Sequence, residues 1–82
     1  MRESPMRKPV LMPDLGAPAT LSVWFASPGD AVYAGDRLVE VLVGGATFDV
    51  SSPVSGRLAE KSAWPDDALT PGQVLGVIEE GV

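Results

Sequence analysis

The 82-residue sequence predicts an all-β fold, a flattened barrel or sandwich of two similar short-stranded sheets related by pseudo-twofold symmetry. Three observations predict it. Apolar residues come in short runs broken by Gly, Pro and Asp; no run keeps a helical period; and the chain repeats itself once. Many short strands joined by Gly/Pro turns are typical of sandwiches and barrels. At this length we expect a single domain.

The expected strands follow the apolar runs, and turn signals such as Pro28-Gly29-Asp30 and Pro71-Gly72 separate them. The six longer predicted strands are Val10–Met12, Thr20–Ala26, Arg37–Val43, Ala46–Val50, Gly56–Lys61 and Val74–Glu79. Two short extended pieces are expected around Val32 and Leu69.

The two halves of the chain resemble each other. Gly35 matches Gly72, which lies 37 residues later, and apolar residues and turn residues agree at the same offset. Further matched pairs are Leu21 with Leu58, Asp30 with Asp67, and Val41 with Ile78. Such a repeat predicts a pseudo-twofold sandwich to which each half contributes one layer.

The segment from Val39 to Val50 predicts a β-hairpin. Its centre is Gly44-Gly45, a pair that suits a two-residue turn in which both residues adopt positive φ. This register opposes Val43 with Ala46, Val41 with Phe48 and Val39 with Val50 on an apolar face, and Leu42 with Thr47 and Glu40 with Asp49 on the other. We expect Val41 and Phe48 to be buried.

The amino-acid composition argues against several classes of function. The chain has no Cys and no His, so the commonest metal ligands and the usual neutral-pH general base are absent. We predict no enzymatic activity, no catalytic residue and no metal site. The neighbouring carboxylates at Asp66-Asp67 and Glu79-Glu80 are interpreted as solubilising charges rather than calcium ligands. The net charge of −5 opposes binding to nucleic acid.

Residues 1–9 are predicted to be a flexible leader, and residues 10–80 the folded domain. The leader holds Arg2, Arg7 and Lys8 and lacks the apolar stretch of a signal peptide. No segment has the length of a membrane span. We therefore expect a cytoplasmic, monomeric protein that does not contact a membrane.

Five segments, in this order and spacing, resemble the lipoyl/biotinyl carrier domains, most closely the lipoyl domains of 2-oxoacid dehydrogenase acyltransferases. Val10–Gly16 resembles their opening strand, Trp24–Asp30 their Trp-Leu-x-x-Pro-Gly-Asp segment, Ala34–Val41 the strand entering the lipoyl hairpin, Ala46–Gly56 their Ala-Thr-Val-Glu-Val and Pro-x-x-Gly stretch, and Pro71–Glu79 the closing strand. The resemblance implies the barrel-sandwich hybrid fold of that family.

The resemblance breaks at the hairpin tip. The lipoyl domains place Asp-Lys-Ala there, and the lysine amine carries lipoate in amide linkage; the biotinyl relatives use Met-Lys-Met. Aligning Ala46 with that alanine puts Gly44 on the aspartate and Gly45 on the lysine. Glycine has no amine, so we expect no cofactor at this position.

Three functional hypotheses follow. The first is a non-catalytic interaction or structural module linked to 2-oxoacid dehydrogenase-type assemblies, with Leu42, Val43, Gly44 and Gly45 as candidate partner contacts. The second is a working swinging-arm carrier modified at another lysine, Lys61. The third, a relative of the lysine-free lipoyl domains of membrane-fusion transport proteins, is disfavoured because a long helical hairpin separates the two halves there, whereas they are contiguous here.

Overall fold

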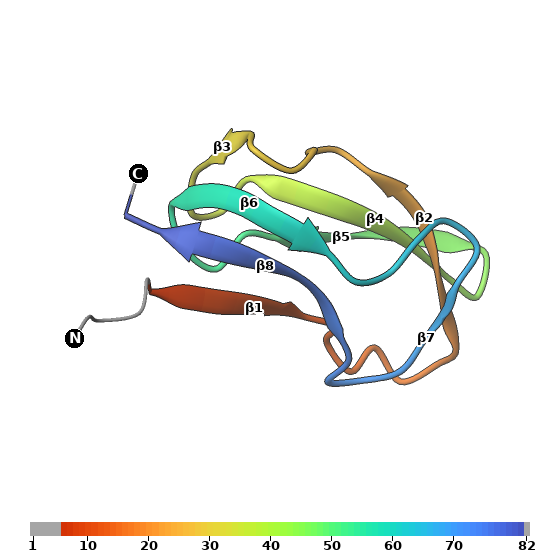
Figure 1. Ribbon diagram of the computed structural model, residues 1–82. Helices are drawn as coiled ribbons and strands as arrows, with labels where there is room; N and C mark the ends of the chain where they lie inside the picture. Colours follow the sequence, from red (N-terminus) through yellow and green to blue (C-terminus); the bar gives the residue numbers. More distant parts are fainter. Residues whose placement is uncertain (1–5, 82) are drawn as a thin grey trace.

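The computed structural model describes residues 6–81 and contains eight strands in two sheets (Figure 1). In chain order the strands are β1 (Arg7–Leu11), β2 (Ala19–Trp24), β3 (Ala31–Val32), β4 (Arg37–Val43), β5 (Ala46–Ser51), β6 (Gly56–Lys61), β7 (Ala68–Leu69) and β8 (Val74–Glu80). One sheet has the order β1-β8-β6-β3 and the other β5-β4-β2-β7, with antiparallel pairing throughout. The predicted all-β sandwich is confirmed, and among residues 6–81 no helix could cross a membrane.

Alternating side chains build the core between the two sheets. In β4 and β8 the same positions are buried: two consecutive residues near the start of each strand, and then the second residue after them, as alternation requires. The largest fully buried side chains are Leu21, Leu38, Leu58, Leu75, Ile78, Val10, Val39 and Val41. Burying each contributes about 1.5–3 kcal/mol, which is the main term holding so small a domain together.

The repeat seen in the sequence is a symmetry of the structure. Leu21 pairs with Val41 in one sheet, and Leu58 pairs with Ile78 at the equivalent place in the other. The turns repeat as well: the Asp30 carboxylate accepts the Ser27 N–H at 2.8 Å, and the Asp67 carboxylate accepts the Trp64 N–H at 2.9 Å. We call residues related by this offset of 37 equivalent positions. Strands β1 and β5 take equivalent places beside β8 and β4.

The expectation that each half forms one layer is wrong in detail, because the halves interlock. The two-residue strand β3 from the first half pairs with β6, and β7 from the second half pairs with β2. Strand β1, which precedes the repeat, joins the second half by pairing with β8. The short strands are edges added by the chain as it crosses between the sheets, so each half supplies an edge to the other.

Strand β1 begins at Arg7, three residues before the expected Val10. Arg7 and Lys8 pair with Glu79 and Ile78 of β8, so long-range pairing extends the strand into the predicted leader. The Arg7 guanidinium also lies 3.3 Å from the Glu60 carboxylate, an exposed pair that contributes little. The rest of the predicted leader, residues 1–5, lies outside the described residues.

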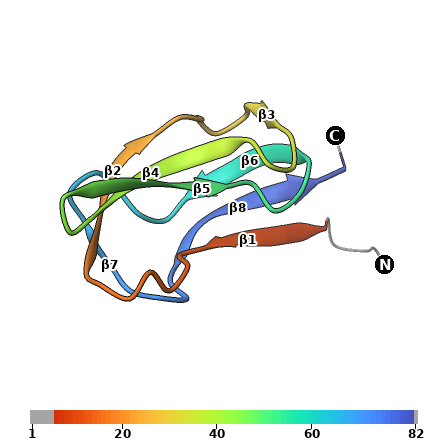
Figure 2. The same cartoon turned by 180° about the vertical axis from the view of Figure 1, so that it is seen from behind.

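The β4–β5 turn lies at the end of the sandwich opposite to the start of β1 and the end of β8 (Figures 1 and 2). A group on this turn is therefore presented away from the points where the chain enters and leaves the described domain. This position makes the hairpin tip a candidate functional site.

Candidate functional site

The β4–β5 hairpin has the register predicted from the sequence. Val43 pairs with Ala46, Val41 with Phe48, and the turn is Gly44-Gly45. The two glycines have φ of 56° and 86°, the left-handed region that costs other L-residues about 1–2 kcal/mol each. A Cβ at either position would meet nothing within 4 Å, so the tip has room for side chains although its backbone favours glycine.

The exposure of the hairpin side chains differs from the prediction at one residue. Phe48 is 47% exposed, whereas its partner Val41 is fully buried. Phe48 lies on an edge strand, and Lys8, which pairs with Ile78 as Phe48 pairs with Val41, is exposed too. The inward side of the edge strands is thus only partly covered, because Val50 of the same strand is buried.

The four candidate contact residues lie together, but they differ in exposure. Leu42 is 42% exposed, on the outward side of β4, and both glycines are exposed. Val43 is half-buried and packs against the core. Of these four residues, Leu42 therefore offers the most exposed apolar side chain to a partner.

The chemistry of the tip does not fit covalently held lipoate or biotin. Attachment in amide linkage requires a side-chain amine, and between Arg37 and Ser51 the chain has no lysine. The only cation in this hairpin is the guanidinium of Arg37, far from the turn at the start of β4. No carrier step can be assigned to these residues.

The other described lysines are not on tight turns. Lys61 ends β6, and its Nζ lies 5.3 Å from the centroid of the Trp24 ring. The Trp24 indole N–H donates to the Ala63 carbonyl at 2.9 Å, which fixes the ring under the ammonium group. Lys8 is exposed in β1. The structure thus gives Lys61 a packing role at a strand end.

The paired carboxylates lie in a turn and in the strand β8. Asp67 caps its turn, and Asp66 adopts a φ of 76° in the same turn. Glu79 lies in register with Arg57 of β6 on one side and Arg7 of β1 on the other. Among residues 6–81, no three acidic side chains gather as metal ligands would.

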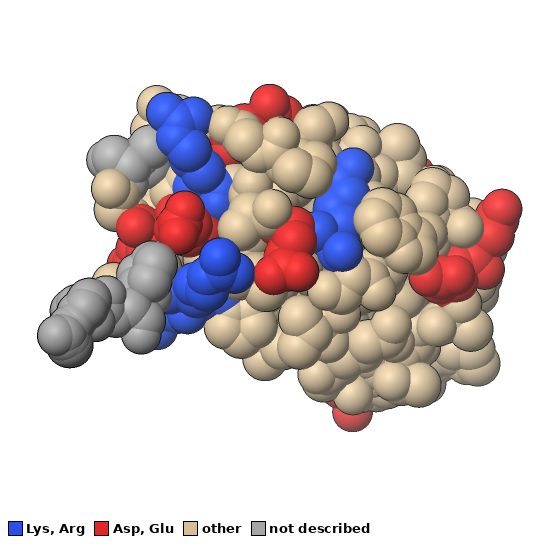
Figure 3. Space-filling model, viewed as in Figure 1, with Lys and Arg blue, Asp and Glu red and all other residues tan. Residues whose placement is uncertain are grey.

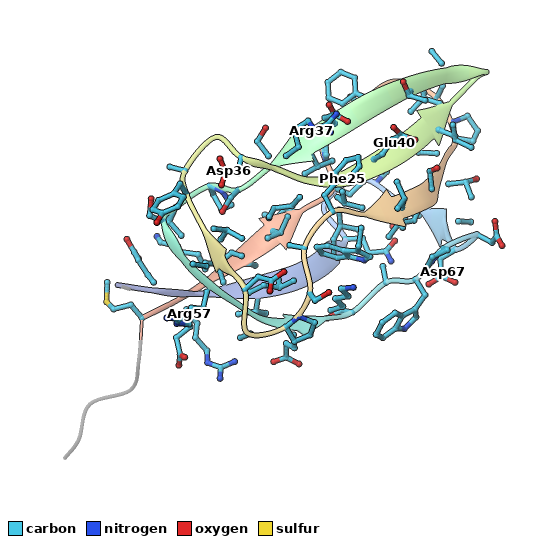
Figure 4. The ribbon with its side chains drawn as sticks, turned by 90° about the horizontal axis from the view of Figure 1, so that it is seen from above. Phe25, Asp36, Arg37, Glu40, Arg57 and Asp67 are labelled. Carbon is cyan, nitrogen blue, oxygen red and sulfur yellow. The ribbon has the colours of Figure 1, made fainter. Side chains whose placement is uncertain are left out.

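A feature that sequence reasoning missed lies on the outward side of β4. The Arg37 guanidinium lies 4.3 Å from the centroid of the Phe25 ring and 3.4 Å from the Asp49 carboxylate. Phe25, Arg37 and Glu40 gather on this side of the sheet (Figure 4). Alternation along each strand could have placed these residues outward, but a bulge at Ser22 in β2 and another at Leu38 in β4 shift the pattern.

Comparison with known families agrees with this geometry. The family model described as "Biotin-requiring enzyme", the biotin/lipoyl attachment domain, matches residues 8–78. The chain belongs to this family. The domain that defines the family is a carrier module rather than a catalytic one. The resemblance seen in the sequence is thus confirmed at the level of the family.

Curated relatives are components of 2-oxoacid dehydrogenase complexes. The dihydrolipoyllysine-residue succinyltransferase component of the 2-oxoglutarate dehydrogenase complex of Bartonella vinsonii subsp. berkhoffii is 35% identical over 79 residues, covering 93% of this chain and 19% of the relative. The acetyltransferase component of the pyruvate dehydrogenase complex of Mycobacterium tuberculosis is 40% identical over 67 residues, covering 78% and 12%. The chain thus spans about a fifth or less of the length of these relatives.

Two solved structures show the same fold. The lipoyl domain of the 2-oxoglutarate dehydrogenase complex of Azotobacter vinelandii matches with a TM-score of 0.67 at 24% identity, covering 95% of this chain and 98% of that domain. A single-chain, multi-domain long-chain acyl-CoA carboxylase matches with a TM-score of 0.81 at 17% identity, covering all of this chain and 8% of that one. This member of the biotin/lipoyl family is therefore a lipoyl-domain-like module.

Proposed function

We propose that this module does not carry lipoate or biotin at its hairpin and acts instead by binding a protein of a 2-oxoacid dehydrogenase-type assembly. The observation that carries the proposal is the tip itself: the hairpin keeps its register up to the turn, and the turn is Gly44-Gly45. The turn thus has the shape that presents a carrier lysine in the family, without the amine. The kinship with acyltransferase components supports the choice of assembly.

The alternative, a swinging-arm carrier modified at Lys61, has less support. An attached arm needs a free amine on an exposed turn, whereas the Lys61 ammonium lies over the Trp24 ring at a strand end. Acylating Lys61 would remove its charge and the cation–π contact with that ring. We therefore place no cofactor on this chain.

Restoring the tip tests the first half of the proposal. The double variant Gly44→Asp with Gly45→Lys is expected to become a substrate of lipoate ligase, because open space surrounds both Cβ positions. The measurement is the intact mass after incubation with ligase, ATP and lipoate. The native chain should keep its unmodified mass of 8.5 kDa, and so should Gly44→Asp alone, which leaves the tip without an amine.

The native chain purified from its own host provides the decisive control. An unmodified mass agrees with the proposal, whereas an added lipoyl or biotinyl mass on Lys61 or Lys8 contradicts it. The assembly link has a separate test, in which the immobilised chain should retain components of a 2-oxoacid dehydrogenase complex. Retention of none of them would contradict that link.

A further inference from the structure

The pseudo-twofold symmetry allows the two outer faces of the sandwich to be compared position by position. The β8 face comprises the outward side chains of β1, β8 and β6, and the β4 face comprises those of β5, β4 and β2. Backbone pairing is the same on both: Thr20 pairs with Leu42, and Arg57 pairs with Glu79 at the equivalent positions. A difference between the faces therefore lies in the side chains and is not required by the fold.

The β8 face combines a set of compensated charges with the exposed apolar side chains of Leu11 and Val74, which are 49% and 40% exposed. Glu79 lies between Arg57 and Arg7, its cross-strand neighbours on either side. In the next row of side chains, the Glu60 carboxylate lies 3.3 Å from the Arg7 guanidinium. Basic and acidic side chains alternate over this face in Figure 3. The charged rows of this face are well suited to remain in water.

On the β4 face, the row of side chains that corresponds to Arg57, Glu79 and Arg7 is neutral. Leu42 takes the position equivalent to Glu79, between Thr20 and Thr47. The neighbouring apolar side chains Val23 and Phe25 stand at positions equivalent to Glu60 and Ser62. Leu42, Val23 and Phe25 are 42%, 39% and 41% exposed. Three polar positions of the β8 face are thus exposed apolar positions on the β4 face, whereas Val74 and Val77 of the β8 face stand where the β4 face has Arg37 and Glu40.

The second row of the β4 face is acidic and incompletely compensated. Glu40 lies directly opposite Asp49, and like charges in this arrangement destabilise the pair. The guanidinium of Arg37 contacts Asp49 and covers Phe25. Within residues 6–81 Glu40 makes no ion pair, although Val23 and Leu42 flank it. The face therefore lacks one cation beside Glu40.

We propose that the β4 face is the docking surface of this module, and that its partner is a protein segment carrying a Lys or Arg flanked by apolar side chains. The cation binds Glu40, and the apolar side chains cover Leu42, Val23 and Phe25. A second copy of the chain fits poorly, because it would bring its own Glu40–Asp49 pair against the first. The proposal rests on the proposed binding function and gives it a surface and a partner chemistry.

The test uses two acetylated, amidated peptides, Leu-Arg-Leu-Lys-Leu and its acidic counterpart Leu-Glu-Leu-Glu-Leu, titrated into the ¹⁵N-labelled full chain. The basic peptide should shift amide signals in β2, β4 and β5, and its affinity should fall as salt is raised. The acidic peptide should leave them unchanged. Equal shifts from both peptides, shifts confined to the β8 face, or self-association of the chain through the β4 face would overturn the proposal.

Equivalent-position exchanges provide matched variants. Leu42→Glu copies the residue found at Glu79, so it should fold, and it should weaken the basic peptide at least tenfold. Glu40→Gln should weaken it several-fold and remove most of the salt dependence. Glu79→Leu, the control on the β8 face, should bind like the native chain. A native-like affinity in Leu42→Glu would count against the assignment, provided that its urea midpoint matches the native one.

The same variants separate this inference from the proposed function. If the immobilised chain retains dehydrogenase components and Leu42→Glu retains them equally, the assembly link stands and the β4 face is wrong. If the chain retains none while the basic peptide still binds the β4 face, the surface stands and the assembly link is wrong.

Discussion

Replacing Gly56 by alanine is expected to abolish stable folding. A Cβ at this position would overlap the Glu79 carbonyl oxygen and come within 2.9 Å of the Glu80 Cα, both of them backbone atoms of the neighbouring strand. Backbone in the middle of a sheet cannot move aside as a side chain can. Overpacking costs about 1–3 kcal/mol even where side chains can adjust, so we expect about 3 kcal/mol or more here. Total stabilities are about 5–15 kcal/mol, and a small domain lies toward the lower end.

The matched control is Ala19, the equivalent position in the other sheet, where a Cβ is already present and buried. Ala19→Gly should cost only about 1 kcal/mol, through added freedom of the unfolded chain and the loss of one buried methyl group. Urea denaturation followed by circular dichroism measures both variants. A Gly56→Ala variant with a native midpoint would show that β6 and β8 are not held at this spacing.

Truncating the core at Leu58 is the second large effect expected. Leu58→Ala should lower the free energy of unfolding by about 2–5 kcal/mol, because the side chain is only 1% exposed and its removal leaves a cavity between the sheets. Leu21→Ala, at the equivalent buried position, should lose a similar amount.

The control for the core truncation is the same change at an exposed leucine. Leu42 is 42% exposed, so Leu42→Ala should alter stability by less than about 1 kcal/mol. The midpoint and slope of urea unfolding distinguish the variants. Similar losses at Leu58 and Leu42 would contradict the burial described above, and would indicate that β4 presents both of its faces to protein.

Most of the fold was predictable from the sequence, because local patterns specify the strands. A run of alternating side chains bounded by Gly, Pro and Asp specifies a short strand and its inward side, and Gly44-Gly45 specifies the turn that sets the hairpin register. The offset of 37 residues correctly paired Leu21 with Leu58 and Asp30 with Asp67 as equivalent positions. The absence of a lysine from the hairpin is likewise a fact of sequence alone.

Tertiary structure decided what depends on residues far apart in the chain. Whether Phe48 is buried depends on what packs over the edge strand, which covers Val50 but leaves Phe48 47% exposed. The start of β1 at Arg7 depends on pairing with Glu79, and the exchange of β3 and β7 depends on where the chain crosses the sandwich. The contrast between the two outer faces depends on the strand pairing, which shows that residues 37 apart lie in matching rows of the two sheets. Alternation along a strand specifies the face of the sheet on which a side chain lies. The neighbours of that side chain are determined by how the two sheets pack.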